Sequence, residues 1–218
     1  MVKLDIVSDP ICPWCYIGKA CLDKALAERP GHPFEIEWHP FQLNPDMPPE
    51  GMDRREYLER KFGGKEGAVQ AYAPIAERAE AEGLTINFDK ITRTPNTMDA
   101  HRLIHWAGIE GRQMAVAMSL FRAYFEDGRD ISDHEVLGDI ADSAEMDAAV
   151  VQKLLASDAD IEGIAGRDKA FREMGITGVP CFIVAGKHAV PGCQPPDLWI
   201  KVIDEIVENL ESGEDTAI

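Results

Sequence analysis

Two cysteines stand three positions apart near the N-terminus, within the segment CPWC at positions 12–15. A short apolar strand is predicted directly before them (2–7), and a helix follows from about residue 13 to residue 26. Cys12 would lie at the start of that helix and Cys15 one turn inside it. Unpaired N–H groups at a helix N-terminus stabilise a thiolate, and a disulfide can close across this spacing. The pattern predicts a redox dithiol in which Cys12, the more exposed thiol, attacks and Cys15 resolves the mixed disulfide.

The same spacing is also found in half of a zinc site, or in a purely structural pair. Zinc takes four ligands, usually as two close pairs, and the sequence contains no second pair of this kind. Cys21 is too far along the predicted helix to share the first turn with Cys12 and Cys15. We therefore expect no metal and no bound cofactor. Asp5 and Asp9 could accept protons near the thiols, but a solvated or capping role is the favoured interpretation of both carboxylates.

Charge and composition exclude several classes of protein. The chain has 218 residues and a formal net charge of −17, and 45% of its residues are hydrophobic. Excess negative charge disfavours nucleic acids and anionic membranes as partners, because both attract basic residues. The first residues enter a strand pattern rather than a secretory signal. We therefore expect a cytoplasmic protein, in which five cysteines do not form a structural disulfide framework.

The elements that must position the dithiol fall into three blocks. The first block reads strand, helix, strand, with the second strand over 34–38. Every periodic signal from about 53 to 158 is helical, and residues 132–135 have the form of a capping box. A helix at about 161–174, a hairpin around positions 181–190 and a helix at about 196–210 follow. This order predicts an α/β fold interrupted by an inserted all-helical domain, with parts at 1–45, 46–158 and 159–218.

Several segments, in order, resemble one known family. These are Ser8-Asp9, CPWCYIG at 12–18, PFQLNP at 40–45, Asn96-Thr97, HRL at 101–103 and Gly178-Val179-Pro180. Together they are similar to the thioredoxin-fold DsbA family, and the finer pattern resembles its FrnE-like subgroup. The resemblance implies a thioredoxin fold and thiol–disulfide oxidoreductase activity on protein or peptide disulfides.

The resemblance also implies that Pro180 is a cis-proline facing the cysteine pair. The backbone of Val179 would then be free to pair with an extended peptide, as a small added strand. Pro13 and Trp14, between the thiols, join Val179 and Pro180 as expected substrate-binding residues. Within the wider group some relatives act on small molecules with glutathione, and they typically carry serine at the position of Cys12. Isomerase or transferase activity with glutathione as co-substrate is therefore the alternative function.

Five polar residues recur in the matching segments and could line a pocket between the two domains. Gln42 and Asn96 are the two that we expect to bind substrate, although Asn96 could equally cap the helix that follows. The other three are Asn44, Thr97 and His101. A third functional class, a peptide-binding module with an apolar groove in the helical domain, suits methionines such as Met114 weakly, because core packing explains them better.

The three remaining cysteines have separate interpretations. Cys21, on the first helix among apolar neighbours, is expected to be a small buried hydrophobic residue. Cys181 and Cys193 depart from the subgroup pattern, which has an aromatic and a small residue there. A two-residue hairpin loop would point them to opposite faces, and a three-residue loop at 186–188 would place them directly across from each other. They are the candidate second redox pair.

Overall fold

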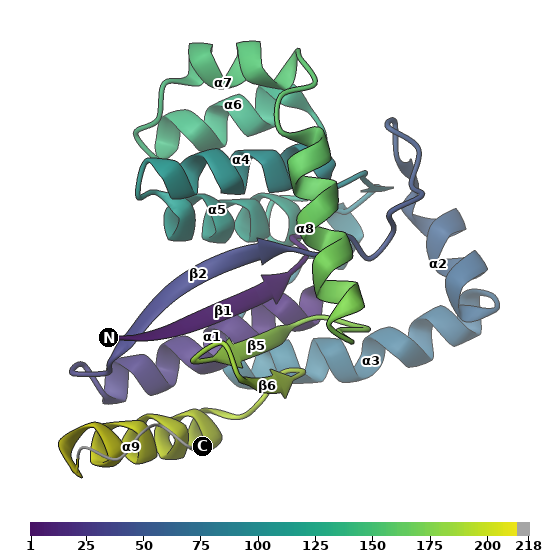
Figure 1. Cartoon of the computed structure of the whole chain (residues 1–218). Coiled ribbons are helices and arrows are strands. Elements are labelled where there is room, and N and C mark those ends of the chain that lie inside the picture. The colour runs from purple at the N-terminus through teal and green to yellow at the C-terminus, as the bar shows by residue number, and fades with distance from the viewer. Residues whose placement is uncertain (213–218) are drawn as a thin grey trace.

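The centre of the fold is a four-stranded mixed sheet. The computed structural model describes residues 1–212, and Figure 1 shows its elements. The strand order is β2-β1-β5-β6; β1 runs parallel to β2, and the other neighbouring pairs are antiparallel. The strands are β1 (Val2–Ser8), β2 (Phe34–Pro40), β5 (Cys181–Val184) and β6 (His188–Pro191). Two strands thus come from the first forty residues and two from near the C-terminus, which confirms the predicted interrupted α/β fold.

Helices cover both faces of this sheet. In Figure 1, α8 (Ile161–Glu173) crosses in front of the strands and α1 (Pro13–Glu28) lies behind them, beside α9 (Pro196–Ser212). Since side chains alternate along a strand, each strand serves both layers. One apolar cluster, on the α1 and α9 side, contains Leu4, Ile6, Phe182 and Val184, and the other contains Val7, Cys181 and Ile183.

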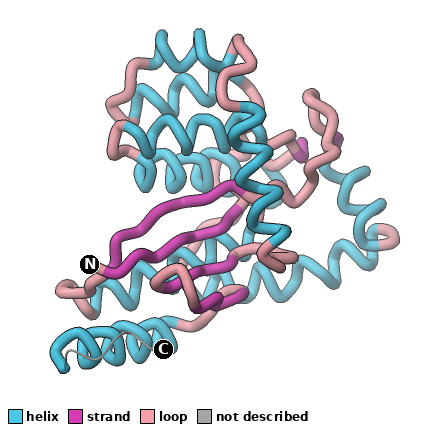
Figure 2. The backbone as a smooth tube through the Cα atoms, viewed as in Figure 1, coloured by secondary structure: helices cyan, strands magenta, loops and turns pink. Residues whose placement is uncertain are grey.

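The region between β2 and α8 is mostly helical. Its later helices lie beside the β2 edge of the sheet, and an earlier helix, over residues 65–82, packs against α1 (Figure 2). Tyr16 of α1 stacks on Phe121 and Phe125 of α5, with ring centroids 5.2 and 5.8 Å apart, which anchors this region to the dithiol helix. Its helices are α2 (Arg54–Phe62), α3 (Lys65–Glu82), α4 (Met98–Ile109), α5 (Gln113–Phe125), α6 (His134–Ser143), α7 (Ala148–Leu155) and the 3-10 turn η1 (Phe88–Lys90).

Two local predictions for this region are wrong. A two-stranded sheet pairs β3 (Met52–Asp53) with β4 (Arg93–Thr94), so the region is not entirely helical. A strand of two residues is too short to show an alternating pattern in the sequence. The cap of α6 is Asp133, whose carboxylate accepts a hydrogen bond from Glu135 N, rather than Ser132. Asp133 has the extended backbone that a cap requires.

The hairpin closes one residue earlier than either alternative that the sequence left open. Val184 pairs with His188, so the loop is Ala185–Lys187, and Cys181 lies opposite Pro191. Ala185 and Gly186 both have positive φ, 54° and 68°. The ring of Phe182 on β5 contacts the ring of Trp199 edge-on, with the ring centroids 4.8 Å apart. This contact holds α9 against the sheet.

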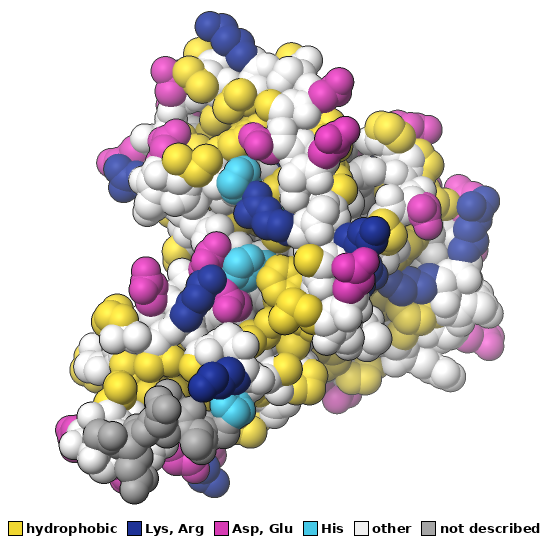
Figure 3. Space-filling model, in the orientation of Figure 1, with side chains coloured by type: hydrophobic (Ala, Val, Ile, Leu, Met, Phe, Trp, Pro, Cys, Tyr) yellow, Lys and Arg dark blue, Asp and Glu magenta, His cyan; other side chains and the backbone are white. Residues whose placement is uncertain are grey.

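The two predicted domain limits fall between elements, one after β2 and one between α7 and α8. That they separate independent domains stays a prediction. The third predicted part, 159–218, extends beyond the described residues. Over residues 1–212, no helix combines the length and apolar character needed to cross a membrane. Acidic and basic side chains are interspersed over the face in Figure 3.

Candidate active site

Cys12 occupies the N-cap of α1. Its backbone is extended (φ −87°, ψ 112°), and its N–H donates to the Asp9 carbonyl at 2.9 Å. Pro13 follows in the first turn, where a residue without an N–H costs the helix nothing. The N–H of Cys15 bonds the Cys12 carbonyl at 3.0 Å. This local sequence therefore places the Cys12 thiol at the positive end of α1 and Cys15 one turn inside it.

The loop before β5 lies against the Cys12 thiol. Cys12 Sγ is 3.5 Å from the Val179 carbonyl oxygen, and the Val179–Pro180 peptide bond is cis. Gly18, one turn beyond Cys15, allows this approach, because a Cβ at Gly18 would lie 3.2 Å from Pro180 Cγ. Cys12, Cys15, Val179 and Pro180 thus form one composite site.

The two thiols are almost equally buried. Cys12 and Cys15 are 3% and 2% exposed, so the greater exposure predicted for Cys12 is marginal. Burial raises the pKa of Cys15 well above its ordinary value, and the nearby Cys12 adds to the rise. The Ser8 side chain and the Asp9 backbone act in the opposite direction on the pKa of Cys15. The environment of Cys15 therefore favours its protonated form.

Asp9 and His101 form a buried polar contact next to the dithiol loop. Asp9 is fully buried, and its carboxylate accepts hydrogen bonds from Ile11 N (3.4 Å) and Leu43 N (2.7 Å). Burial raises the pKa of Asp9 to about 7 and lowers the pKa of His101 to about 4. His101 Nε2 lies 3.8 Å from Asp9; with His101 neutral above about pH 4, this contact is not an ion pair at neutral pH.

A solvated Asp9 was one of the interpretations that the sequence favoured. The structure shows instead that Asp9 is buried. Its carboxylate joins the dithiol loop to the segment after β2. Asp5 has a different role, since its carboxylate bonds Lys3 (3.0 Å) and His39 (2.6 Å) on the opposite face of β1 from Leu4. Asp5, Glu37 and His39 are close enough to share a metal ion. Lys3 Nζ lies 2.8 Å from Glu37 as well, so both carboxylates already share one ammonium group as their partner.

Gln42 and Asn96 lie together, as the expected pocket requires, but they bond to each other. Gln42 Nε2 donates to Asn96 Oδ1 at 3.2 Å and contacts Thr97 Oγ1 at 3.5 Å. Asn96 Oδ1 also accepts from Met98 N at 2.9 Å, but the N-cap of α4 is Thr97 and not Asn96, so the capping role allowed for Asn96 is wrong. Asn44 is bonded separately, to the Tyr57 hydroxyl at 2.9 Å.

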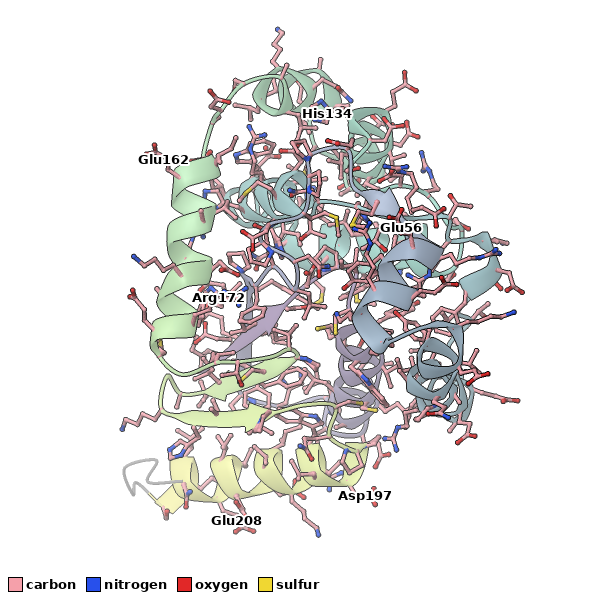
Figure 4. All side chains as sticks on the ribbon, turned by 90° about the vertical axis from the view of Figure 1, so that its right-hand side faces the viewer. Glu56, His134, Glu162, Arg172, Asp197 and Glu208 are labelled. Atoms are coloured by element: carbon pink, nitrogen blue, oxygen red, sulfur yellow. The ribbon has the colours of Figure 1, made fainter. Side chains whose placement is uncertain are left out.

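The backbone of Gln42 is fixed as firmly as its side chain. Its N–H donates to Asp168 at 2.7 Å and its carbonyl accepts from Arg172 at 2.5 Å. Arg172, labelled in Figure 4, extends from α8. These contacts place Gln42 at the junction of α8 with the start of the helical region.

The candidate redox pair of Cys181 and Cys193 is wrong. Cys181 points to the α8 face of the sheet, among Val7, Phe41 and Ile183, while Cys193 packs on the cluster that contains Ile17 and Cys21. The sheet lies between the two thiols. Cys193 Sγ is instead 3.9 Å from Cys21 Sγ. Cys21 is buried as expected, but it faces a thiol that is 172 positions away, a contact with no local sequence signal.

Trp14 is half-buried and packs against this same cluster, while Pro13 is buried in the first turn of α1. Ser8, whose side chain lowers the pKa of Cys15, belongs to a segment that carries the resemblance but was given no role at the site. Its position at the end of β1, immediately before the dithiol loop, was the available signal.

The sequence model of the family described as "DSBA-like thioredoxin domain" matches residues 3–204 of the chain. The chain belongs to this family. A crystal structure of a probable DsbA oxidoreductase from Streptomyces coelicolor is similar over all of this chain and 93% of that one, with 31% identity and a TM-score of 0.83. The uncharacterized protein YwbO from Bacillus subtilis is 28% identical, over 94% of this chain and 96% of its own length.

Two solved structures with lower sequence identity show the fold alone. A 2-hydroxychromene-2-carboxylate isomerase is similar over 98% of this chain and all of its own, with 15% identity and a TM-score of 0.75. The cytosolic disulfide reductase DsbM from Pseudomonas aeruginosa, solved with GSH, is similar over 94% of this chain and 99% of its own, with 17% identity and a TM-score of 0.67. The fold therefore occurs both in proteins named for disulfide chemistry and in one named for isomerisation.

Proposed function

We propose that this protein is a thiol–disulfide oxidoreductase that uses Cys12 and Cys15 on protein or peptide disulfides. One observation carries the proposal: the Cys12 thiol lies at the start of α1, 3.5 Å from the Val179 carbonyl, with a second thiol one turn behind it. A structural cysteine pair has no need of an adjacent backbone carbonyl in a loop from the other end of the chain. A structural zinc site would need two further ligands at these thiols.

In the reductive direction, the Cys12 thiolate attacks one sulfur of the substrate disulfide. A Cys12–substrate bond forms as the substrate S–S bond breaks, and the departing thiolate takes up a proton. Cys15 then loses its proton and attacks Cys12 Sγ. The second substrate thiol leaves, so the substrate gains two electrons and the Cys12–Cys15 pair loses them. The reverse sequence oxidises a dithiol.

Protection of Cys15 by burial gives this order of events. Because the pKa of Cys15 is raised well above its usual range, the thiol does not compete for the incoming disulfide. Formation of the mixed disulfide removes the neighbouring negative charge on Cys12, which makes Cys15 easier to ionise. Ser8 assists by favouring the ionised form of Cys15.

The substrate backbone is proposed to pair with Val179, with Pro13, Trp14 and Pro180 around it and Gln42 and Asn96 at the domain junction. We assign the chain to the FrnE-like subgroup on its CPWC and PFQLNP segments. We also propose a cytoplasmic location and glutathione as a further co-substrate, supported by the five free thiols and by the DsbM structure with GSH.

The test is reduction of insulin disulfides, together with a glutathione redox titration of the Cys12–Cys15 pair. Cys12→Ala is expected to lose at least about 100-fold in rate, and Cys15→Ala to accumulate a mixed disulfide. Cys181→Ala, a matched replacement of a buried thiol on the other face of the sheet, is expected to keep the wild-type rate.

Three outcomes would contradict the proposal. These are a pair that never oxidises across the titration, equal rates for wild type and Cys12→Ala, or stoichiometric zinc in the purified protein. The isomerase alternative has one supporting observation, the fold of the chromene-carboxylate isomerase. It would be favoured if Cys12→Ser retained glutathione-dependent isomerisation of a small molecule while losing disulfide exchange.

A further inference from the structure

A second pair of thiols lies behind the proposed active site, at the contact of α1, α3 and the loop after β6. Cys21 Sγ and Cys193 Sγ are 3.9 Å apart. Cys21 is on α1, six residues beyond Cys15, which is about 9 Å further along the helix axis. Buried apolar residues of α1 and α3 surround the pair, namely Ile17, Ile75 and Ala79. We infer that Cys21 and Cys193 form a second redox dithiol, which closes to a disulfide by exchange with a low-molecular-weight disulfide.

The two thiols are unequal in access and in environment. Cys21 is fully buried, whereas Cys193 is half-buried in an irregular segment. Arg78 of α3 places Nη2 3.5 Å from Cys21 Sγ and ion-pairs with Glu82 at 2.8 Å. Cys193 is therefore the sulfur that an external disulfide can reach, and Cys21 is the sulfur beside a positive charge.

Ionisation of the pair agrees with this assignment. The hydrogen bond from Cys193 lowers the pKa of Cys21 to about 7, against the effect of burial, and the Arg78 guanidinium lowers it further. The same hydrogen bond, followed by burial, raises the pKa of Cys193. Cys21 thus holds the shared negative charge, and Cys193 donates its proton towards it.

The exchange can then be written in two balanced steps. The Cys193 thiol passes its proton to the Cys21 thiolate as its sulfur attacks the small disulfide, whose S–S bond breaks and releases one thiolate. Cys21 loses that proton again, to solvent or to the released thiolate, and its sulfur attacks Cys193 Sγ. The second small thiol leaves, so one disulfide is reduced to two thiols and the Cys21–Cys193 pair is oxidised.

The chain around Cys193 can supply the necessary movement. A disulfide has sulfur atoms about 2.05 Å apart, so closure needs an approach of roughly 2 Å from the present separation. Cys21 is fixed in α1, but Cys193 follows Gly192, whose φ is 77° and whose Cα faces open space. The Cys193 segment also meets α1 directly, because a Cβ at Gly18 would lie 3.6 Å from Cys193 Cα.

The experiment uses Cys12→Ala/Cys15→Ala, so that its outcome is independent of the proposed function. The full-length variant is equilibrated with oxidised and reduced glutathione at a series of ratios, quenched with acid, alkylated and digested for mass spectrometry. We expect a Cys21–Cys193 cross-linked peptide that grows with the share of oxidised glutathione, while Cys181 stays free as the internal control. If the double variant does not fold, wild type gives the same readout, because the two pairs yield peptides of different mass.

Two further measurements make the assignment sharper. A bond that spans 172 positions should raise the Tm of the oxidised protein by roughly 5 °C or more, and Cys193→Ala should abolish that shift. Arg78→Gln should slow closure several-fold, and Arg78→Lys should largely restore it. The inference is overturned if Cys21 remains free at every ratio, or if Cys193 is found only as a glutathione adduct. Unchanged closure in Arg78→Gln would overturn the role given to Arg78.

Discussion

The carboxylate of Asp9 accepts a hydrogen bond from Leu43 N at 2.7 Å, which joins the dithiol loop to the segment that leads into the helical region. Asp9 is fully buried, so its carboxylate is held where its charge is poorly solvated. The result is a pKa of about 7 for Asp9, caused first by burial. The group that positions the dithiol loop therefore changes its charge near neutral pH.

We predict that Asp9→Asn gains stability relative to wild type as the pH rises. The folded-state pKa of Asp9 is above its unfolded value, so folded wild type binds the proton more tightly between about pH 4 and pH 7. Wild type therefore loses stability across that window, on the order of 4 kcal/mol in total, whereas the amide does not titrate. Urea denaturation at pH 4.5 and pH 7.5 measures the difference; the His101 contribution largely cancels between variant and wild type.

Asp204→Asn is the matched control for this experiment. Its exposed carboxylate pairs with Arg29 at 2.7 Å, and that contact lowers the pKa of Asp204. Asp204 is therefore ionised in both folded and unfolded chains over the window, so its variant should show no change with pH. A difference between Asp9→Asn and wild type that is equal at both pH values would refute the raised pKa of Asp9.

Gly18→Ala should reduce activity with little effect on stability. A helical Gly-to-Ala change stabilises by about 1 kcal/mol, but the new methyl group would press on Pro180 Cγ, 3.2 Å away. We expect the disulfide-reduction rate to fall several-fold while the free energy of unfolding changes by less than about 1 kcal/mol. Gly166→Ala, on α8 with open space around it, should stabilise the protein and leave the rate unchanged. Equal rates in both variants would show that the Gly18–Pro180 contact is unimportant.

Arg102 of α4 is predicted to hold the segment between α7 and α8 against the helical region. Its guanidinium is 1% exposed and donates to the carbonyls of Ala159 (2.7 Å), Leu154 (2.6 Å) and Ser157 (2.7 Å). Arg102→Leu would remove this buried donor from all three carbonyls, although Leu154 O still accepts from Ser157 N and Oγ, and should lower the free energy of unfolding by roughly 3–5 kcal/mol. The exposed Arg122 on α5 provides the comparison, since Arg122→Leu should cost less than about 0.5 kcal/mol in urea denaturation. Similar losses would contradict a structural role specific to Arg102.

The elements with local signals could be predicted from the sequence. The alternation in β1, the proline at the start of α1 and the amphipathic α9 are short-range features, and each element lies where its pattern indicates. The dithiol at a helix start follows from the same local rules. The grouping of strands from both ends of the chain also follows, since neither half forms a sufficient sheet alone.

Features that depend on register or long-range packing could not be predicted. Cys181 lies opposite Pro191, so a strand that continued would place Cys193 on the same face as Cys181. Instead β6 ends at Pro191, and the chain turns at Gly192, whose φ is 77°, before Cys193. The Cys21–Cys193 contact depends on how the segment after β6 folds back onto α1. The burial of Asp9 likewise requires the segment around Leu43 to cover it. A single sequence contains no short-range signal for any of these contacts.

Ser8→Ala should slow the second half of the proposed reaction and spare the first. The Ser8 side chain lowers the pKa of Cys15 against the stronger effect of burial, so its removal should make Cys15 harder to ionise. Cys12 attack does not require Cys15 to ionise, whereas release of the mixed disulfide does. In rapid-quench experiments with a peptide disulfide, formation of the mixed disulfide should keep its wild-type rate, and its decay should be several-fold slower. Raising the pH should narrow the gap in decay rate, because Cys15 ionises more readily there. A uniform loss in both steps would indicate a distorted loop rather than a raised pKa of Cys15.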